Sequence, residues 1–122
     1  MPEYNELWDY HTCYGVNYEG MGCAKVNSGL FTAFLDMGDV RGVFTGHDHV
    51  NDFWGELHGI RLHYGRGTGC GAYGQEGMLR GARVIRLNES DPADFATWLR
   101  LEDGSVVEAQ PAHKPEKVWK RI

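Results

Sequence analysis

The spacing of hydrophobic residues predicts one amphipathic helix in the first third of the chain. Residues 1–26 show no sustained period, so we predict a long irregular lead-in there. Between 28 and 37 the apolar residues fall on one helical stripe, with Asn27 as the predicted N-cap and Gly38 as the terminator. The residues of this stripe are Leu30, Phe31, Phe34 and Leu35. The one helix that the sequence clearly predicts therefore covers about residues 28–37.

Three segments that follow predict strands. The apolar run at 40–45 comes directly after the helix, so it predicts a buried strand of an α/β unit. Apolar and polar residues alternate at 60–64, which predicts a half-buried strand. Residues 81–87 predict a further strand.

The C-terminal part predicts a hairpin and a tail. Segments 95–101 and 105–108 flank Asp103-Gly104, a pair that supplies the positive φ angles of a tight two-residue turn. Residues 110–122 contain prolines and lysines with few large apolar side chains, so we expect a loosely attached tail. Residues 1–109 then form one α/β domain, mostly of β-strands, with too few helices to cover both faces of a sheet.

The composition of the chain argues against nucleic-acid and membrane partners. The 122 residues include 17 acidic and 12 basic side chains, which give a formal charge of −5 and disfavour a nucleic-acid partner. No apolar run reaches the length of a membrane span and the N-terminus lacks a signal-peptide pattern, so we expect no membrane partner and assign no compartment. Three cysteines without C-x-x-C spacing argue against a disulfide scaffold or a thiolate zinc site.

The strongest chemical signal is Gly46-His47-Asp48-His49, here called the GHDH loop. It follows a predicted strand, and α/β sheets usually bind ligands at the carboxyl ends of their strands. Two histidines two residues apart can both face one point, and imidazole with carboxylate suits Zn, Fe or Mn better than Ca. His47 and His49 are therefore candidate metal ligands. The spacing alone is also common in histidines that bind nothing, so both interpretations stay open.

Residues near the GHDH loop are candidates for supporting roles. Those that can orient the metal ligands are Asp48, Asn51, Asp52 and His63. His63 lies opposite the apolar side of its predicted strand, so we expect it to be exposed. Arg66 opens a glycine-rich stretch whose amides can hold an anion, which makes Arg66 a candidate phosphate contact. A glycine-rich crossing without a ligand is the alternative. His11 and Glu19 can approach a metal only if the lead-in folds over the loop.

The ordered series of motifs resembles the calcineurin-like metallophosphoesterases, in the branch related to purple acid phosphatases. Gly46-His47-Asp48-His49 matches the closing G-H-x-H motif of that family, and Pro2-Glu3-Tyr4 resembles the end of its H-x-P-x-P-E-[YF] segment. The other similar segments are VNSGLFTAFLDMGDVRGVFTGHDH (26–49), GHDHVNDF (46–53), YGRGTGCGAYG (64–74) and GARVIRL (81–87). The resemblance covers about residues 2–108.

This resemblance implies a fold and an activity. The family folds as a two-sheet α/β/β/α sandwich, and this chain would be its C-terminal part. The family hydrolyses phosphate esters with two transition-metal ions, so the resemblance implies a phosphorylated substrate, with His47 on one ion and His49 on the other. Two such ions can hold the phosphate, generate hydroxide near neutral pH and stabilise an in-line displacement.

The other ligand motifs of the family, D-x-H, G-D-x-x-D and G-N-H-[DE], belong before the first residue of this chain. We therefore expect a truncated phosphoesterase, or one whose site a second chain completes, as in a dimer that brings four imidazoles together. Half a sandwich would also leave apolar faces uncovered, which favours a homodimer. The alternatives are a non-catalytic oligomerising or structural metal-binding module and a smaller hydrolase with a mononuclear site.

Overall fold

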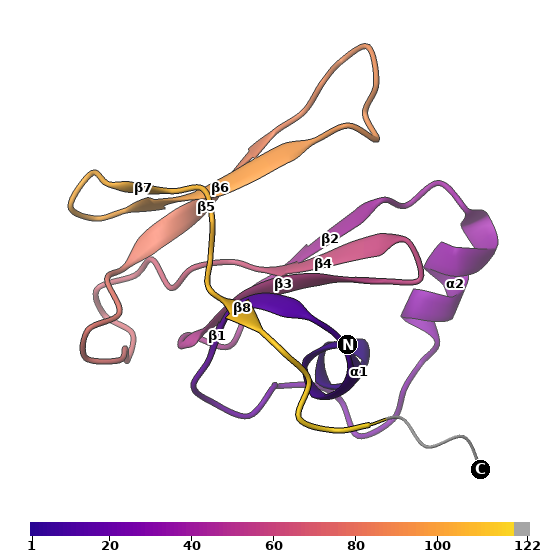
Figure 1. The fold of residues 1–122 in the computed structure, drawn as a ribbon, viewed down its shortest axis with the longest axis horizontal. Helices are drawn as coiled ribbons and strands as arrows, with labels where there is room; N and C mark the ends of the chain where they lie inside the picture. Colours follow the sequence, from indigo (N-terminus) through magenta and orange to yellow (C-terminus); the bar gives the residue numbers. More distant parts are fainter. Residues whose placement is uncertain (119–122) are drawn as a thin grey trace.

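Strands dominate the structure, a computed structural model that describes residues 1–118 (Figure 1). In chain order the elements are α1 (Glu3–Tyr10), β1 (Cys13–Asn17), α2 (Leu30–Met37), β2 (Gly42–Thr45), β3 (Asn51–Leu57), β4 (Ile60–Tyr64), β5 (Gly81–Arg86), β6 (Ala96–Leu101), β7 (Val106–Val107) and β8 (Ala112–His113). A five-stranded sheet has the order β2-β4-β3-β1-β8, and a three-stranded sheet the order β5-β6-β7. This mixed α/β architecture agrees with the predicted C-terminal part of an α/β sandwich.

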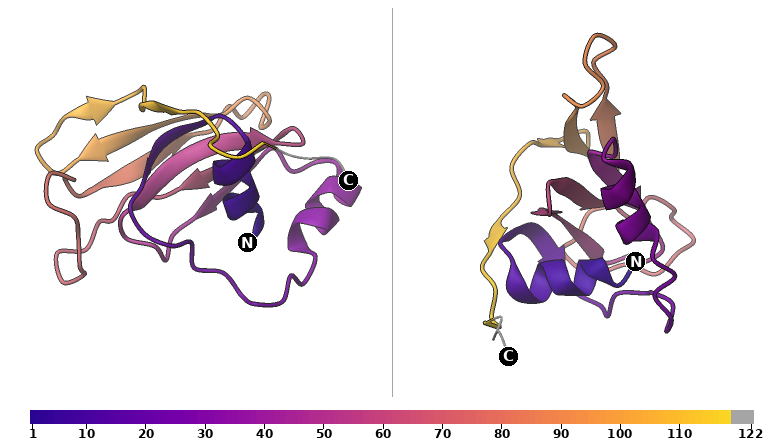
Figure 2. Two further views of the ribbon diagram at one scale, coloured as in Figure 1. Left: turned by 60° about the horizontal axis from the view of Figure 1, so that its bottom comes forward. Right: turned by 90° about the vertical axis from the view of Figure 1, so that its right-hand side faces the viewer.

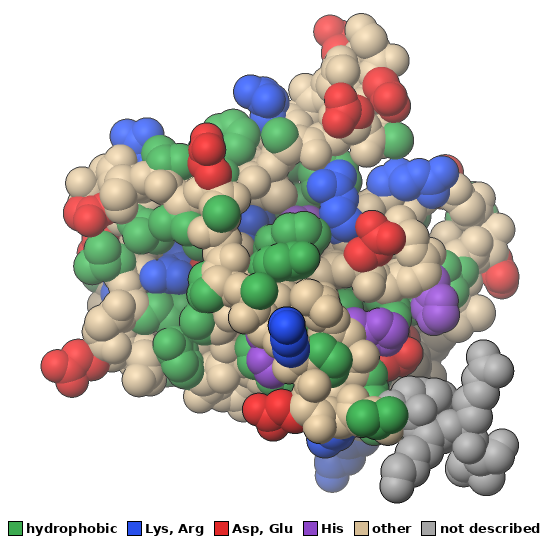
Figure 3. Space-filling view, in the orientation of Figure 1, with side chains coloured by type: hydrophobic (Ala, Val, Ile, Leu, Met, Phe, Trp, Pro, Cys, Tyr) green, Lys and Arg blue, Asp and Glu red, His purple; other side chains and the backbone are tan. Residues whose placement is uncertain are grey.

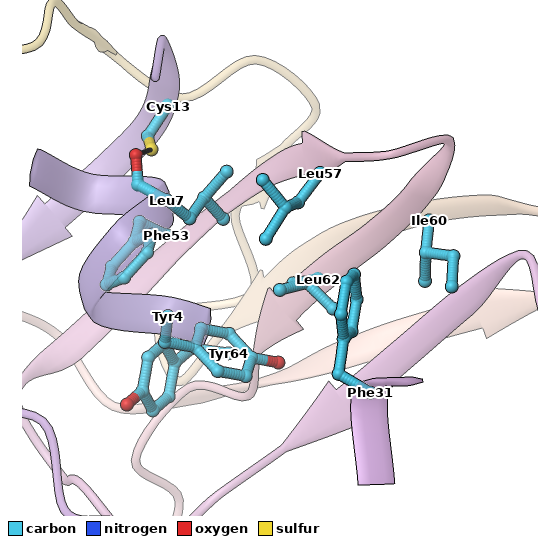
Figure 4. Packing of buried hydrophobic residues seen from close by; sticks show 9 residues of the cluster. All are labelled: Tyr4, Leu7, Cys13, Phe31, Phe53, Leu57, Ile60, Leu62 and Tyr64. Atoms are coloured by element: carbon cyan, nitrogen blue, oxygen red, sulfur yellow. Dashed lines mark hydrogen bonds between the residues drawn. The ribbon is translucent and has the colours of Figure 1, made fainter. Parts of the chain in front are cut away.

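Both helices pack on one face of the five-stranded sheet (Figures 1 and 2). Their buried side chains meet those of β3 and β4 in one cluster (Figure 4). The cluster consists of Tyr4, Leu7, Cys13, Phe31, Phe53, Leu57, Ile60, Leu62 and Tyr64. Burying a large apolar side chain contributes roughly 1.5–3 kcal/mol, so this layer is the main apolar support of the sheet from which the GHDH loop emerges.

Helix α1 corrects the prediction of an irregular lead-in over 1–26. Tyr4 and Leu7 lie one turn apart on its buried face, with relative exposures of 2% and 0%. Leu7 packs so closely on the sheet that a Cβ at Gly55 would lie 2.9 Å from its Cδ1 atom. A helix of 8 residues is too short to be stable alone, so contacts with the sheet stabilise it and a search for sustained periodicity misses it.

Helix α2 confirms the predicted helix, and Gly38 terminates it with a φ of +74°. The start differs from the prediction, because Gly29 rather than Asn27 is the N-cap residue. The Asn27 side chain instead accepts a hydrogen bond from the Gly29 backbone N–H at 3.0 Å. Asn27 therefore shapes the turn that leads into the helix.

The predicted strands at 40–45 and 60–64 appear as β2 and β4, but with different burial, whereas β3, which pairs with β4, was not predicted. β2 is an edge strand and is only half-buried along its length, because in the described chain it pairs with β4 alone. β4 is more buried than predicted, since the helices cover one of its faces and Phe44, Trp54 and Phe95 contact His63 on the other. His63 is 1% exposed, so the prediction that it is exposed is wrong.

The predicted hairpin forms between β6 and β7, with a longer turn than expected. The Leu101 N–H donates to Ser105 O at 2.9 Å, which leaves three residues in the loop rather than two. Gly104 has the expected positive φ, +86°. A three-residue loop that ends in a left-handed glycine is a common hairpin alternative to the two-residue turn.

The C-terminal segment is attached to α1 and β1 rather than loose (Figure 2). β8 pairs with β1, and His113 stacks on Trp8 with ring centroids 3.7 Å apart. Lys117 forms an ion pair with Asp9 at 2.6 Å. Residues 119–122 of the predicted tail lie outside the described residues.

No helix within residues 1–118 is long and apolar enough to cross a bilayer. Acidic, basic and hydrophobic side chains are interspersed on the face seen in Figure 3.

Candidate functional site

The GHDH loop connects β2 to β3 and turns sharply at His47. His47 has a φ of +81°, a left-handed conformation that is uncommon in residues other than glycine. Its imidazole lies against Gly22, where an added Cβ would come within 2.6 Å of His47 Cδ2. A strained residue of this kind costs about 1–3 kcal/mol and persists only where its surroundings hold it. The loop therefore depends on contacts from other segments.

Asp48 provides one of these contacts and points inward. It is 8% exposed and accepts hydrogen bonds from the Gly22 N–H at 3.1 and 3.0 Å, one to each carboxylate oxygen. The Tyr64 hydroxyl donates to Asp48 Oδ2 at 2.6 Å. Burial and the hydrogen bond to Asp48 raise the pKa of Tyr64 above its ordinary value, so Tyr64 stays a donor. Asp48 thus ties the loop to the lead-in and to β4.

Asn51 provides a second contact to the lead-in. Its fully buried side-chain oxygen accepts hydrogen bonds from the Tyr18 N–H at 3.1 Å and the Glu19 N–H at 3.0 Å. Asn51 Nδ2 lies 3.4 Å from Asp48 Oδ2. Asp48 and Asn51 together hold residues 18–22 against the loop. Both were predicted to orient the site, and both contact the loop or the segment packed on it.

Glu19 provides the third contact. From the sequence, we expected Glu19 near a metal only if the lead-in folds over the loop. One of its carboxylate oxygens accepts the N–H groups of His49 and Val50, at 2.6 and 3.0 Å. The other accepts the Tyr73 hydroxyl at 2.6 Å. The Tyr73 bond, followed by the backbone donors, lowers the pKa of Glu19. Glu19 therefore remains a charged acceptor beside the loop.

Tyr73 is a contact of the site that the sequence did not predict. Its ring stacks on the His49 imidazole, with centroids 4.1 Å apart and planes 17° apart. It belongs to the glycine-rich stretch 65–74, for which the sequence predicts only an anion-binding loop or a crossing without a ligand. A lone tyrosine among glycines that follow a strand was the available signal.

Asp52 and Arg66 pair with each other between β3 and the glycine-rich stretch. Arg66 Nη1 lies 2.8 Å from Asp52 Oδ2, and Arg83 of β5 binds the other oxygen at 3.1 Å. Asp52 is fully buried, and Arg66 also donates to Leu79 O at 2.7 Å. This network joins the two sheets. The phosphate contact expected of Arg66 stays a prediction.

His63 lies between the two sheets and away from the loop. Neighbouring side chains of a strand face opposite sides, and its neighbour Tyr64 is the one that reaches Asp48. The His63 ring stacks on Phe44 at 4.7 Å and on Trp54 at 5.3 Å, and both its nitrogens are buried without a hydrogen-bond partner. Burial, helped by nearby arginines, lowers the pKa of His63 to about 3. It is therefore a neutral interior histidine.

His47 and His49 fit part of a metal site. His49 Nδ1 is buried without a hydrogen-bond partner, so the imidazole keeps an unused ligand atom. A closed metal site takes three or four protein ligands. Among residues 1–118, no group of three or more His, Cys, Asp and Glu side chains is placed to hold an ion. His11 lies at the C-terminal end of α1, with its Nε2 atom 4.0 Å from Glu6 Oε1. Within residues 1–118 it does not join His47 and His49 as a third ligand.

Comparison with known proteins gives relatives of one kind. No protein-family model and no solved structure matches the chain. Three curated proteins of Arabidopsis thaliana do match it. "Probable inactive purple acid phosphatase 29" is 43% identical over 120 residues, 90% of this chain. The proteins with the same name and the numbers 14 and 28 are 40% and 43% identical, over 84% and 83% of the chain.

The chain spans less than a third of the length of these relatives, between 27% and 31%. Their names place them among purple acid phosphatases and describe them as "probable inactive" members. The similarity confirms the resemblance that the motifs indicated. Over the part that it matches, the chain belongs to the purple-acid-phosphatase-related branch of the metallophosphoesterases.

Proposed function

We propose that this chain contributes His47 and His49 to a transition-metal centre of the metallophosphoesterase type. The observation that carries the proposal is the way the GHDH loop is held. Asp48, Asn51 and Glu19 fix its backbone and the segment that covers it, while no hydrogen bond within residues 1–118 engages either imidazole. A left-handed His47, kept in place at an energetic cost, is typical of a site under functional constraint.

The chemistry of the proposed centre depends on the metal ions that it binds. Zinc, iron or manganese held by His47 and His49 would supply Lewis-acid chemistry toward a phosphate group. Within this chain, the role of the loop is to present two imidazoles at the carboxyl end of β2. Phosphate ester hydrolysis would need further ligands, from a second chain or from sequence outside these residues.

We propose a homodimer as the source of those ligands, with the two GHDH loops facing each other. Exposed apolar side chains elsewhere on the chain also favour association. They include Leu30, Leu35, Met37 and Leu87, at 49%, 40%, 71% and 69% exposure. A metal that bridges the loops would make this dimer dependent on the ion.

Pairing through the open edge of β2 would give a different dimer. Two-fold symmetry makes such a pair antiparallel, so the two loops would lie at opposite ends of the paired strands. That dimer would be independent of metal. Light scattering with and without a chelator separates the two arrangements: the proposal predicts dissociation to monomers when the metal is removed, and a dimer that survives chelation contradicts it.

The second candidate is a non-catalytic module that binds a structural ion or none. The names of the relatives, which call them "probable inactive" phosphatases, favour it, as does the small number of ligands brought together within residues 1–118. This candidate predicts no turnover under any metal condition.

Metal analysis and a phosphatase assay on the same samples test both candidates. The 122-residue chain is loaded with Zn, Fe or Mn, dialysed, and assayed with p-nitrophenyl phosphate. We expect bound metal in the wild-type chain and a loss of that metal in the His47→Ala/His49→Ala variant. The control is His11→Ala, which removes a histidine from the end of α1 and should bind as wild type. Full metal content in the double variant would refute the proposal.

A further inference from the structure

We propose that Tyr73 is a positioning residue for the His49 imidazole and that Glu19 holds the two together. The inference rests on the proposed metal site and says how one of its ligands is oriented. Tyr73 and Glu19 come from distant parts of the chain and meet only at the GHDH loop.

The three residues form a closed set of contacts. Glu19 binds the backbone of His49 with one carboxylate oxygen, at 2.6 Å, and the Tyr73 hydroxyl with the other, also at 2.6 Å. The Tyr73 ring in turn stacks on the His49 imidazole, with the two ring centroids 4.1 Å apart. The backbone of His49 and the plane of its ring are therefore fixed by the same carboxylate. A displacement of any member loosens the other two.

Stacking orients the imidazole without occupying either of its ring nitrogens. The two rings are nearly parallel, 17° apart, so Tyr73 covers a face of the imidazole. The lone pair through which imidazole binds a metal lies in the ring plane, so stacking leaves it free. Holding the ring in advance also removes part of the entropy cost of ordering a side chain on binding.

The stretch that carries Tyr73 is itself held in place. Arg80 donates to Gly69 O at 2.7 Å through Nη1 and to Ala72 O at 2.6 Å through Nη2. These bonds brace the glycine-rich segment immediately before Tyr73. The tyrosine is nevertheless 56% exposed, so its ring contributes little to the core. A well-anchored but exposed aromatic ring on a candidate ligand indicates a role at the site rather than in folding.

The hydrogen bond that joins Tyr73 to Glu19 is short, with 2.6 Å between the hydroxyl and carboxylate oxygens. Hydrogen bonds to a carboxylate are shorter and stronger than those between neutral groups. This bond therefore holds the Tyr73 ring over the His49 imidazole.

Co²⁺ binding to variants of the full chain tests the inference. Loss of a residue that orients a metal ligand typically costs about 10–100-fold in affinity, and we expect this loss for Tyr73→Ala. Tyr73→Phe keeps the stacked ring and should restore most of the affinity. The matched control is Tyr18→Ala, which removes a tyrosine of the same exposure, 56%, from the neighbouring segment. It should bind Co²⁺ as the wild type does.

A second readout follows the His49 ring without metal. A stacked tyrosine shifts the His49 Cε1–H resonance, so Tyr73→Ala should move that resonance and Tyr73→Phe should leave it close to wild type. An unmoved resonance, or equal Co²⁺ affinity in Tyr73→Ala and wild type, overturns the inference while the metal site stands. Failure of the wild-type chain to bind Co²⁺ overturns the proposed function and this inference together.

Discussion

The Tyr64 hydroxyl donates a 2.6 Å hydrogen bond to Asp48 Oδ2 and so joins the core strand β4 to the GHDH loop. Tyr64 is 3% exposed and belongs to the helix-facing core, whereas Asp48 lies between the two candidate ligands. The same residue therefore packs against Tyr4 and Phe53 and holds the loop carboxylate. Core packing and loop geometry are coupled through one side chain.

Tyr64→Phe should destabilise the fold by about 1–3 kcal/mol, because it leaves a buried carboxylate short of one donor. The free energy of unfolding in urea measures the loss. Tyr14→Phe is the matched control, since Tyr14 is partly exposed, at 36%, and stacks on Trp54 through its ring. Equal stability of the two variants would show that the Asp48 bond does not support the loop.

Asp52→Asn should be the most destabilising of the conservative changes. Asp52 is fully buried and pairs with both Arg66 and Arg83, and removal of one partner from a buried ion pair typically costs about 3–5 kcal/mol. Asp9→Asn serves as the comparison, because its pair with Lys117 is largely exposed and an exposed pair contributes about 0–1 kcal/mol. Thermal and urea unfolding should rank the two variants in that order, and similar losses would contradict the buried network.

His47→Gly should increase stability by about 0.5–1 kcal/mol, since glycine adopts a positive φ without strain. It should also abolish metal binding. His58 offers the control, because it is the other described non-glycine residue with a positive φ, +50°. His58→Gly should likewise stabilise the chain and leave metal binding unchanged. A destabilised His47→Gly variant would show that the side chain, rather than the backbone conformation, supports the loop.

Stability should fall as the pH drops below about 6.5, partly because of His63. Its pKa is lowered from 6.5 to about 3 in the folded chain by burial, so the unfolded state binds the proton first. This contribution is fully present above the unfolded pKa and is lost as the pH falls towards the folded one, at a slope of at most about 1.4 kcal/mol per pH unit.

His63→Phe should flatten the pH dependence of stability between pH 6 and 4 relative to wild type. His11→Phe, at the end of α1, is the control and should keep the wild-type slope. Urea unfolding at a series of pH values gives the comparison. Parallel curves for wild type and His63→Phe would mean that His63 is solvated in solution.

Local patterns predicted the elements whose signals lie within one segment. Helix α2 ends at Gly38, and the Asp103-Gly104 turn joins a hairpin, because backbone conformation at glycine is a local property. Helix α1 was not predicted because its two buried residues, Tyr4 and Leu7, are buried by packing against β3, and the local sequence does not show that contact. Burial of His63 depends in the same way on a second sheet that arrives from later in the chain.

The candidate site likewise contains residues that a local motif predicts and residues that it does not. The spacing of His47 and His49 was visible in the sequence, since both ligands lie in one short motif. The carboxylate of Glu19 and the ring of Tyr73 reach His49 from segments far away in the sequence, and no short motif contains that relationship. The predicted roles of Asp52 and Arg66 at the site stay predictions, and the contact of the two residues with each other required the arrangement of both sheets.

X-ray absorption at the zinc edge is the most direct test of the central claim, because it counts the imidazoles bound to the ion. The 122-residue chain is loaded with zinc and compared with the His47→Ala and His49→Ala single variants. The account predicts imidazole scattering from the wild-type chain, with a loss of imidazole ligands in each variant. Zinc that is bound without imidazole ligands, or an unchanged spectrum in both variants, would contradict the assignment of these two histidines as the metal ligands.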